Sequence, residues 1–477
     1  MRTEKDIIGS REIPADALYG IHALRASEHF PGMHPFPLEW YKALGMVKCA
    51  YYRAAGRFSE ELKKEGLQHK FRDTLLPEET ASLLEAAATE VSQGLHYAHF
   101  IVPGLNGGAG TSINMNINEI IANLALLKAG DAPGDYSHID PIHHANIYQS
   151  TNDVVPSALR LAVMLALPEL EEAINLLRKA LEEKENLYRN DLRLGYTQMQ
   201  AAVPTSWGRL FSSYSEALSR DWWRISRCQE RIKVLNLGAG ASGTGLSIPR
   251  FVIVDVIKQL QQLTGLPLSR SENLADATAN HDSLVEVHGM LKALAVNLEK
   301  MAADLRMLAA GTGHQEISLP ALQAGSSIMP GKVNPVIPEY VISIAHQVYA
   351  NDQLITSLSA QGTLELNAYI PLIGKSLLES LRYLIHACRT MEEKMIQGLV
   401  VDTEKAERRV WHSPSITTAF IPYIGYHQAG EIAALMKERN LDVFEAAQQS
   451  ELVSEEVIRK ALRKESLLKL GYSVKDL

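Results

Sequence analysis

The residue types best suited to chemistry stand in one polar loop, residues 324–335, which reads Ala-Gly-Ser-Ser-Ile-Met-Pro-Gly-Lys-Val-Asn-Pro. A glycine–serine start precedes a lone cation, Lys332, and a carboxamide, Asn334, and apolar, helix-like sequence borders the loop on both sides. This composition is typical of a mobile loop that closes on a small anion and brings a hydroxyl group to it. On composition alone, a plain helix-to-helix turn with an exposed lysine is the alternative.

Hydroxyl and amide side chains also gather in three other polar segments beside helical stretches. These residues are Thr111, Ser150, Thr151, Asn152 and Thr197. Each is a common helix cap, and 150–152 look like the start of a helix. Helix N-termini offer free N–H groups and the positive end of a dipole, which suit a dicarboxylate. Capping a helix and binding a small dianion are therefore compatible at these positions.

The loop sequence GSSIMPGKVNP resembles the signature of the aspartase/fumarase superfamily, whose members split a C–N or C–O bond of a succinyl-type substrate and release fumarate. Similar stretches extend the resemblance, in the family's order, over nearly the whole chain: 16–26, 107–119, 149–153 and 195–198. The resemblance implies an all-α, three-domain fold with a central bundle of long helices. It also implies a homotetramer in which each active site draws residues from three chains.

The resemblance further implies a role for each polar position. Ser326 is the base, and Lys332 and Asn334 bind the α-carboxylate. The doubly charged aci-carboxylate intermediate needs several donors aimed at one oxygen pair, and this task falls to the hydroxyl groups of Thr111, Ser150, Thr151 and Thr197, with Ser327 in the same oxyanion environment. Asn152 lies near the amino group, Gln198 also contacts the substrate, and Glu339 orients Lys332. A serine is a poor base, so desolvation, a cation and backbone donors must lower its pKa.

The leaving group depends on positions outside the loop. Fumarases carry a catalytic histidine at the position that matches Gln198, and glutamine cannot titrate. Hydroxide leaves less readily than an amine and benefits from a proton donor, so Gln198 favours ammonia release, as does GGAGTS at 107–112. The stretch 279–282 and Gly331 are as similar to fumarases as to aspartases. We predict reversible deamination of L-aspartate to fumarate and ammonia by anti β-elimination, with fumarate hydration as the alternative.

Departures from the family pattern leave other substrates open. Tyr196 replaces an arginine, Ala201 an aspartate and Val155 an aromatic residue. Loss of bulk at Val155 would enlarge the pocket and admit an N-substituted aspartate. Argininosuccinate and adenylosuccinate lyases are a further possibility, but they usually carry other residues around the signature lysine. An inactive structural relative is the non-enzyme alternative, and the intact loop residues disfavour it.

Composition narrows the class of protein. With 477 residues the chain predicts two or three domains, and its net charge of −8 argues against a nucleic-acid partner. Cys49, Cys228 and Cys388 have no metal or redox spacing and indicate reduced thiols. The sequence lacks an apolar signal core and any apolar run of about 18 residues. We expect a cytoplasmic protein without a membrane partner.

Three sequence patterns resemble cofactor or metal sites, but their sequence context does not support such sites. The glycine run 238–243 fits GxGxxG, but helical stretches flank it where a dinucleotide site needs a parallel sheet, so a structural turn is expected. The signature loop has one residue too many for a P-loop. The pairs His96/His99 and His143/His144 match no metal-binding motif. We therefore predict no cofactor and no metal.

Hydrophobic periodicity predicts long helices. Apolar residues recur at alternating steps of four and three over 170–188, 287–308 and 377–395, where Cys388 is expected to fill the core. Stripes of this length suit a bundle of helices, part of which is buried against another copy of the chain. Polar stretches suggest boundaries that divide the chain into an N-terminal lyase domain (1–149), a central helical-bundle domain with the signature loop (150–405) and a small C-terminal helical domain (406–477).

Overall fold

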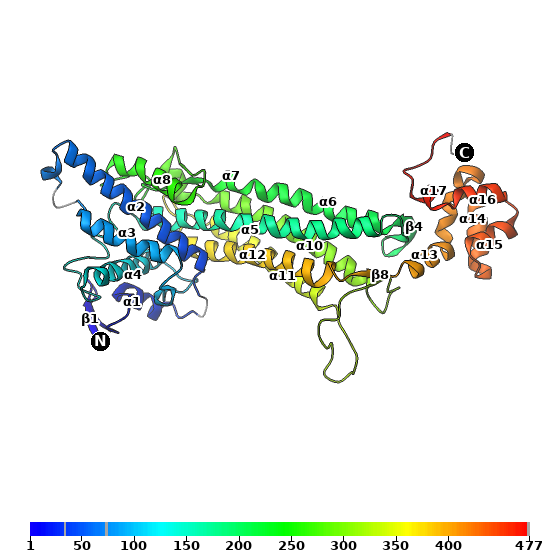
Figure 1. Ribbon diagram of the computed structural model, residues 1–477, viewed down its shortest axis with the longest axis horizontal. Helices are drawn as coiled ribbons and strands as arrows, with labels where there is room; N and C mark the ends of the chain where they lie inside the picture. The colour runs from blue at the N-terminus through cyan, green and yellow to red at the C-terminus, as the bar shows by residue number, and fades with distance from the viewer. Residues whose placement is uncertain (33–34, 72–74, 475–477) are drawn as a thin grey trace. The chain divides into compact units, whose positions relative to one another are not determined.

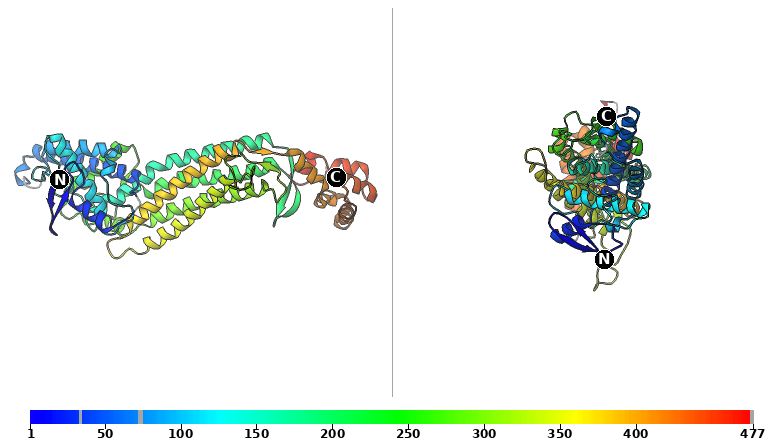
Figure 2. Two further views of the ribbon diagram at one scale, coloured as in Figure 1. Left: turned by 90° about the horizontal axis from the view of Figure 1, so that it is seen from below. Right: turned by 90° about the vertical axis from the view of Figure 1, so that its left-hand side faces the viewer.

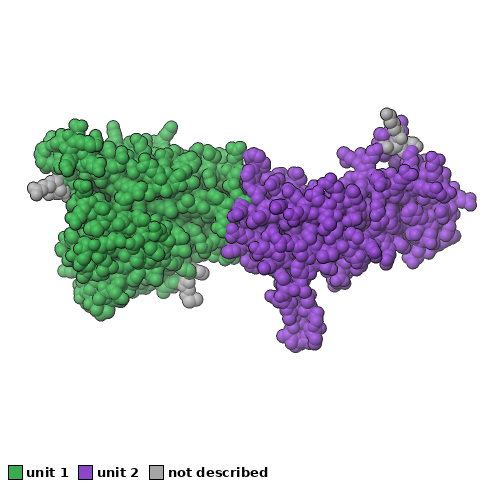
Figure 3. Space-filling model, viewed as in Figure 1, with its two compact units in different colours: residues 1–171, 224–293, 346–384 green, residues 172–223, 294–345, 385–477 purple. Residues whose placement is uncertain are grey.

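The computed structural model describes residues 1–32, 35–71 and 75–474, and helices dominate these ranges (Figure 1). Every sheet within them has two strands. The all-α prediction is confirmed. Contacts divide the chain into two compact units, each made of three segments (Figure 3). Unit 1 comprises residues 1–171, 224–293 and 346–384, and unit 2 comprises 172–223, 294–345 and 385–477. The three-domain division is a different description of the chain and stays a prediction.

Unit 1 contains the N-terminal helices and two small sheets. Its helices are α1 (Ile21–His29), α2 (Leu38–Lys64), α3 (Glu78–Ser92), α4 (Thr111–Ala129), α7 (Cys228–Ile232), α8 (Arg250–Thr264) and α9 (Leu274–Ala279), with 3-10 turns η1 (Gln68–Lys70) and η2 (Tyr97–His99). The sheets are the antiparallel pair β1 (Arg2–Lys5) and β2 (Ser10–Ile13) and the parallel pair β5 (Val234–Leu235) and β6 (Ser269–Arg270).

Five long helices contribute residues to both units. They are α5 (Thr151–Leu187), α6 (Trp207–Ser226), α10 (Asp282–Leu308), α11 (Val336–Ser359) and α12 (Ile370–Met391), which η3 (Glu392–Ile396) continues as a π-helical turn. The three predicted helical stretches are therefore confirmed. Their stripe residues are buried, Cys388 among them, except for the half-buried Tyr188.

Polar contacts join the long helices inside unit 1, where Figures 1 and 2 agree in placing them side by side. On α10, the His288 ring lies 2.9 Å from Asp352 of α11 and 2.9 Å from Ser380 of α12. Gly374 of α12 allows a close approach, since a Cβ there would lie 2.4 Å from the Trp40 ring of α2. These helices thus share one core in this unit.

The same helices are also joined within unit 2. The Tyr214 hydroxyl of α6 donates to Asp304 of α10 at 2.8 Å, and Asn297 of α10 donates to Asp221 of α6 at 2.7 Å. Unit 2 adds two antiparallel sheets and the C-terminal helices. These are β3 (Leu192–Thr197) with β4 (Gln200–Ser206), β7 (Ile317–Ser318) with β8 (Val400–Val401), α13 (Thr403–His412), η4 (Pro414–Phe420), α14 (Ile421–Arg439), α15 (Val443–Ser450), α16 (Glu455–Ala461) and α17 (Lys464–Leu468).

The C-terminal helices share a hydrophobic core with the β3–β4 hairpin. Leu192 and Leu194 of β3 pack in one buried cluster with Val410 of α13, Phe420 of η4 and Ile432 of α14. The hairpin therefore gains its stability from tertiary packing, since an isolated two-stranded hairpin is marginal in water. This core explains why unit 2 includes residues 406–477.

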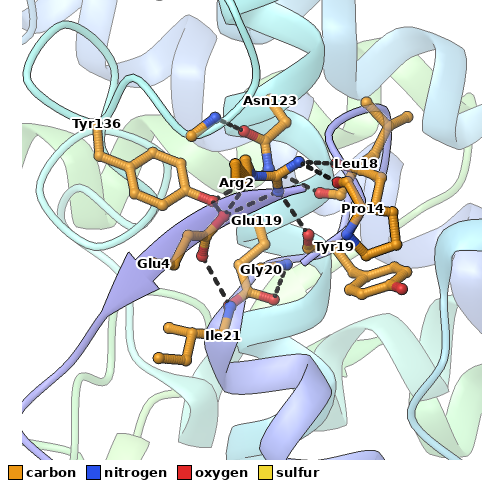
Figure 4. Close-up of polar contacts among 12 residues, drawn as sticks. Arg2, Glu4, Pro14, Leu18, Tyr19, Gly20, Ile21, Glu119, Asn123 and Tyr136 are labelled. Carbon is orange, nitrogen blue, oxygen red and sulfur yellow. Dashed lines mark hydrogen bonds and ion pairs between the residues drawn. The ribbon is translucent and has the colours of Figure 1, made fainter. Parts of the chain in front are cut away.

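A buried carboxylate ties the N-terminal segment to α4 in unit 1 (Figure 4). Glu119 accepts the backbone N–H groups of Gly20 at 2.8 Å, His22 at 2.8 Å and Ala23 at 3.2 Å, at the start of α1. Burial raises the pKa of Glu119 to about 8, and the three N–H groups oppose that shift. Two of the stretches that carry the family resemblance, 16–26 and 107–119, are thus held together by this side chain.

Candidate functional site

In unit 1, the candidate site residues lie at the starts of two helices. The predicted helix start at 150–152 is confirmed, because α5 begins at Thr151. Ser150 Oγ accepts the Asn152 N–H at 3.2 Å, and the Ser150 N–H donates to Asp153 Oδ1 at 3.2 Å. Such bonds satisfy the N–H groups that a helix start leaves unpaired. Ser150, Thr151 and Asn152 are half-buried.

The second helix start belongs to α4, whose first residue is the exposed Thr111. Gly110 precedes it with φ +90°, and a Cβ there would lie 2.9 Å from Val155 Cγ1. The fully buried Val155 of α5 therefore packs directly on the chain that leads into Thr111. Its side chain lies against protein, and the prediction that this position admits an N-substituted aspartate stays untested.

The glycine run 238–243 supports the start of α5. The Asn152 amide donates to the Ala241 carbonyl at 2.7 Å, and the Gly240 N–H donates to Asp153 Oδ2 at 3.0 Å. Gly243 has φ +84°, and a Cβ there would lie 2.3 Å from the Ala275 Cα. These glycines are needed for backbone geometry, which supports the structural interpretation. The strand before them, β5, is only two residues long.

A buried lysine lies beneath these helix starts, and the sequence interpretation missed it. The Nζ of Lys48, on α2, is 2.8 Å from Asn114 Oδ1, 2.5 Å from Asn118 Oδ1 and 3.4 Å from Asn146 Oδ1. Lys48 is fully buried. Burial lowers its pKa, and the charge of Asp153 opposes the shift.

Asp153 is the acidic counterpart of that lysine and was missed as well. It is fully buried, which raises its pKa, while the N–H groups of Gly240 and Ser150 stabilise the charged form. A lysine inside the otherwise apolar run 43–52 was the signal that could have drawn attention to this part of the chain. A charge at a core position is rare unless neighbouring groups satisfy it.

In unit 2, the signature loop is organised by its own backbone. Ala324 and Val333 form an antiparallel bridge, and the Gly325 N–H donates to the Lys332 carbonyl at 2.7 Å. The Asn334 amide donates to the Gly325 carbonyl at 2.9 Å. The structure thus brings Ser326, Ser327, Lys332 and Asn334 together in one narrow loop, with Ser327 and Lys332 exposed and the other two half-buried.

Ser326 has a distinctive environment inside the loop. Its Oγ accepts two backbone N–H groups, from Ile328 at 3.2 Å and from Met329 at 3.0 Å. Donors aimed at an oxygen stabilise that oxygen when it is charged. The loop therefore carries its own pair of donors for a serine alkoxide.

Thr197 and Gln198 lie at the tip of the β3–β4 hairpin. Thr197 ends β3, and the two turn residues, Gln198 and Met199, have φ of +51° and +61°. Positive φ at both turn positions is typical of a type I′ hairpin, which normally carries asparagine or glycine there. The tip is exposed. A strained turn of this kind is compatible with a functional role.

The tyrosine that replaces the family's arginine, Tyr196, is part of a polar cluster in unit 2. Its hydroxyl donates to Glu316 at 2.9 Å and accepts from Arg409 of α13 at 2.5 Å, and Arg409 also pairs with Glu316. Glu316 is buried. The cluster links the hairpin strand that ends in Thr197 to the segment that precedes the signature loop.

Glu339 has a partner other than the one that we expected. Its carboxylate lies 3.0 Å from Arg306 Nη2 of α10, in an ion pair between half-exposed side chains. The role of Glu339 in orienting Lys332 remains a prediction that this contact does not support.

The described residues lack two other kinds of feature. Among the described residues, no group of three or more His, Cys, Asp or Glu side chains is placed to hold a metal ion. Within the same ranges, no helix combines the length and apolar character needed to cross a membrane. His96 pairs with Glu90, and His144 Nδ1 accepts the Asp140 N–H at 2.9 Å, so both have local partners.

Known proteins match the chain along most of its length. Residues 9–350 match the lyase family, and residues 416–469 match the fumarase C C-terminus. The aspartate ammonia-lyase of Escherichia coli K12 is 38% identical over 482 residues, which cover 100% of this chain and 98% of the relative. A fumarate lyase:delta crystallin from Brucella melitensis bound to cobalt has a TM-score of 0.89 at 36% identity and covers 98% of both chains. A class II fumarase from Schistosoma mansoni has a TM-score of 0.88 at 27% identity, covering 97% of this chain and 98% of that one.

Proposed function

The chain belongs to the aspartase/fumarase superfamily and is a C–N lyase, and on this premise we propose that it converts L-aspartate to fumarate and ammonia by β-elimination at Ser326. The observation that carries the proposal is the pair of backbone N–H groups on Ser326 Oγ. An alkoxide held by two donors, in a site that excludes water, is a competent base for a weakly acidic C–H bond.

The proposed reaction transfers one proton and breaks two bonds, the C–H bond beside the β-carboxylate and the C–N bond. Ser326 Oγ takes the proton from the carbon beside the β-carboxylate, which gives the aci-carboxylate dianion. Its electron pair then forms the double bond of fumarate as the C–N bond breaks and ammonia leaves. No cofactor is required, because proton transfer and charge stabilisation account for both steps.

Binding of the two carboxylates is assigned to donors on the helix starts, the hairpin and the loop. Lys332 and Asn334 hold the α-carboxylate, and Asn152 lies near the amino group. The hydroxyl donors for the developing dianion are Thr111, Ser150, Thr151 and Thr197, with Ser327 and Gln198 beside them. The positive dipole ends of α4 and α5 support this assignment, since Thr111 and Thr151 begin those helices.

We further propose that the enzyme is a homotetramer whose active sites combine residues from different chains. Thr111, Ser150, Thr151 and Asn152 belong to unit 1, whereas Thr197 and Ser326 belong to unit 2. Association of several copies would let units from different chains complete one site. The three buried free cysteines suit a reducing compartment, so we place the enzyme in the cytoplasm.

Fumarate hydration is the second candidate function, because a class II fumarase has the same fold at 27% identity. Gln198 favours ammonia release over hydration, since its amide cannot serve as the titrating proton donor that a poor leaving group needs.

The test measures fumarate absorbance with purified protein and L-aspartate, L-malate, argininosuccinate or an N-alkyl aspartate in turn. We expect turnover of L-aspartate. Turnover of malate alone would replace this function with the hydratase, and a preference for the N-alkyl substrate would favour the substituted amine. No product from any of the four would support the non-enzyme alternative.

A further inference from the structure

The acceptors around Lys48 are all neutral amides. Its Nζ contacts the Oδ1 atoms of Asn114 and Asn118 on α4 and of Asn146 in the segment before α5. An ammonium group has three donors and no acceptor, so three oxygens match it completely. A fully buried cation without a contacting carboxylate is costly, which calls for a reason beyond packing.

The lysine determines which way the Asn114 amide faces. Because an ammonium group only donates, the oxygen of Asn114 must face Lys48 and the NH2 group must face away. That NH2 group donates to Asn146 Oδ1 at 3.0 Å and to Thr151 Oγ1 at 3.3 Å. Lys48 therefore fixes an N–H donor on the oxygen of Thr151.

This arrangement leaves the Thr151 hydroxyl proton free to be donated. The Asn114 N–H occupies one side of Thr151 Oγ1, so the O–H bond must point elsewhere. Within the described part of the chain, that proton has no hydrogen-bond acceptor, although Thr151 is only half-exposed at the first position of α5. A hydroxyl group held in this way is preorganised as a donor.

We infer that Lys48 is a positioning residue that, through Asn114, aims the Thr151 hydroxyl proton at the carboxylate of the substrate. The inference rests on the proposed function, in which Thr151 stabilises the aci-carboxylate. Lys48 does not touch the substrate. Its contribution is to fix the direction of a neutral amide so that a neutral hydroxyl donates rather than accepts.

A double-mutant cycle tests this chain of contacts. Thr151→Val removes the hydroxyl at constant shape and should lower kcat by about 100-fold with L-aspartate, as expected for loss of one preorganised donor. Lys48→Met should lower kcat by about 10-fold, the usual size when an outer positioning partner is lost. In the Thr151→Val background, Lys48→Met should change kcat by less than about 2-fold, because its target is already absent.

A second variant keeps the test decisive if Lys48→Met fails to fold. Asn114→Asp gives the buried lysine a carboxylate partner, so the fold should keep its unfolding midpoint. A carboxylate cannot donate to Thr151 and would instead accept the hydroxyl proton. We expect kcat to fall by at least about 10-fold, and again the change should vanish in the Thr151→Val background.

Asn123→Leu is the matched control, because Asn123 is another buried asparagine of α4 and its side chain forms hydrogen bonds with Leu18, Gly134 and Tyr136. Its effect should add to that of Thr151→Val. If Lys48→Met or Asn114→Asp is also additive, or leaves kcat unchanged, the inference is wrong. If Thr151→Val itself has no effect while aspartate is still deaminated, the proposed role of Thr151 fails instead, and the two failures can be told apart.

Discussion

Two regions support the proposed site in different ways. Protein encloses the polar cluster of Lys48, Asn114 and Asn118 behind Thr151, whereas the loop at 324–335 exposes most of its side chains. Lys48 is 0% exposed, and Ile328 at the centre of the loop is 84% exposed. Side-chain amides and a cation organise the cluster in unit 1, while the loop in unit 2 is organised by its own backbone and the Asn334 amide.

The difference matches the two tasks of the proposed reaction. Stabilising a dianion needs donors that are already in place, because reorganisation during the reaction is costly. Removing a proton needs a base that can be brought to the substrate and shielded from water after binding. Changes in the loop should therefore alter catalysis, whereas changes that leave buried polar groups of unit 1 without a hydrogen-bond partner should also alter stability.

The largest effect is expected from Ser326→Ala. Loss of the proposed base should lower kcat for L-aspartate by about 1,000-fold or more, measured by fumarate absorbance. Because Ser326 lies in an exposed loop, the free energy of unfolding of this variant, measured by thermal unfolding, should stay within about 1 kcal/mol of that of the parent protein. Ser327→Ala is the matched control, with a smaller loss. Retention of turnover in Ser326→Ala would remove this residue as the base.

Replacing the buried Glu119 should mainly change stability, in contrast to the change at Ser326. Glu119→Leu leaves three backbone N–H groups at the start of α1 without their acceptor, and we expect a loss of about 3 kcal/mol in the free energy of unfolding. Glu119→Gln keeps one oxygen and should lose about 1 kcal/mol. Denaturant unfolding followed by circular dichroism measures both. A Glu119→Leu variant as stable as the parent protein would show that these bonds contribute little.

Sequence patterns predicted the long helices well because their stripes are set by local periodicity. The apolar stripe residues between Val287 and Leu308 and between Leu377 and Met391 are buried along α10 and α12 as expected. The position of the helix start at Thr151 was also predictable, because capping is a local property. The motif residues of the loop are neighbours in sequence, so their proximity follows directly.

Contacts between distant segments were harder to predict. Lys48 and Asn146 are 98 positions apart in the sequence, and Tyr196 and Arg409 are 213 positions apart. Local hydrophobic periodicity therefore carries no information about either contact. The β3–β4 hairpin was missed because Gln198 and Met199 are unusual in a type I′ turn. The Arg306 partner of Glu339 lies on another helix, which the signature motif alone does not specify.

The pH dependence of the free energy of unfolding should distinguish a buried histidine of unit 1 from an exposed histidine. Burial lowers the pKa of His281 to about 3, so the native state keeps it neutral while the unfolded chain binds a proton below pH 6.5. This contribution to stability is therefore present above pH 6.5 and is lost as the pH falls toward 3. Between pH 7 and pH 5 the loss should be about 2 kcal/mol.

His281→Gln should remove that part of the pH dependence, measured as unfolding free energies at pH 7 and pH 5. The matched control is His427→Gln, at an exposed position on α14, which should keep the dependence of the parent protein. The same loss in all three proteins between the two pH values would contradict burial of a neutral His281.

The smallest expected effect concerns the hairpin tip in unit 2. Met199 is 74% exposed with φ +61°, a conformation that costs a side-chain-bearing residue about 1–2 kcal/mol and glycine almost nothing. Met199→Gly should therefore raise the stability of the protein by about 0.5–1 kcal/mol after the entropy cost of glycine. The exposed Val203 of β4 in the same hairpin is the matched control, where Val203→Gly should lower stability by a similar amount, because an extended strand has no such strain to relieve. A loss of stability in Met199→Gly would mean that the methionine side chain, and not the backbone, determines the energy of this turn.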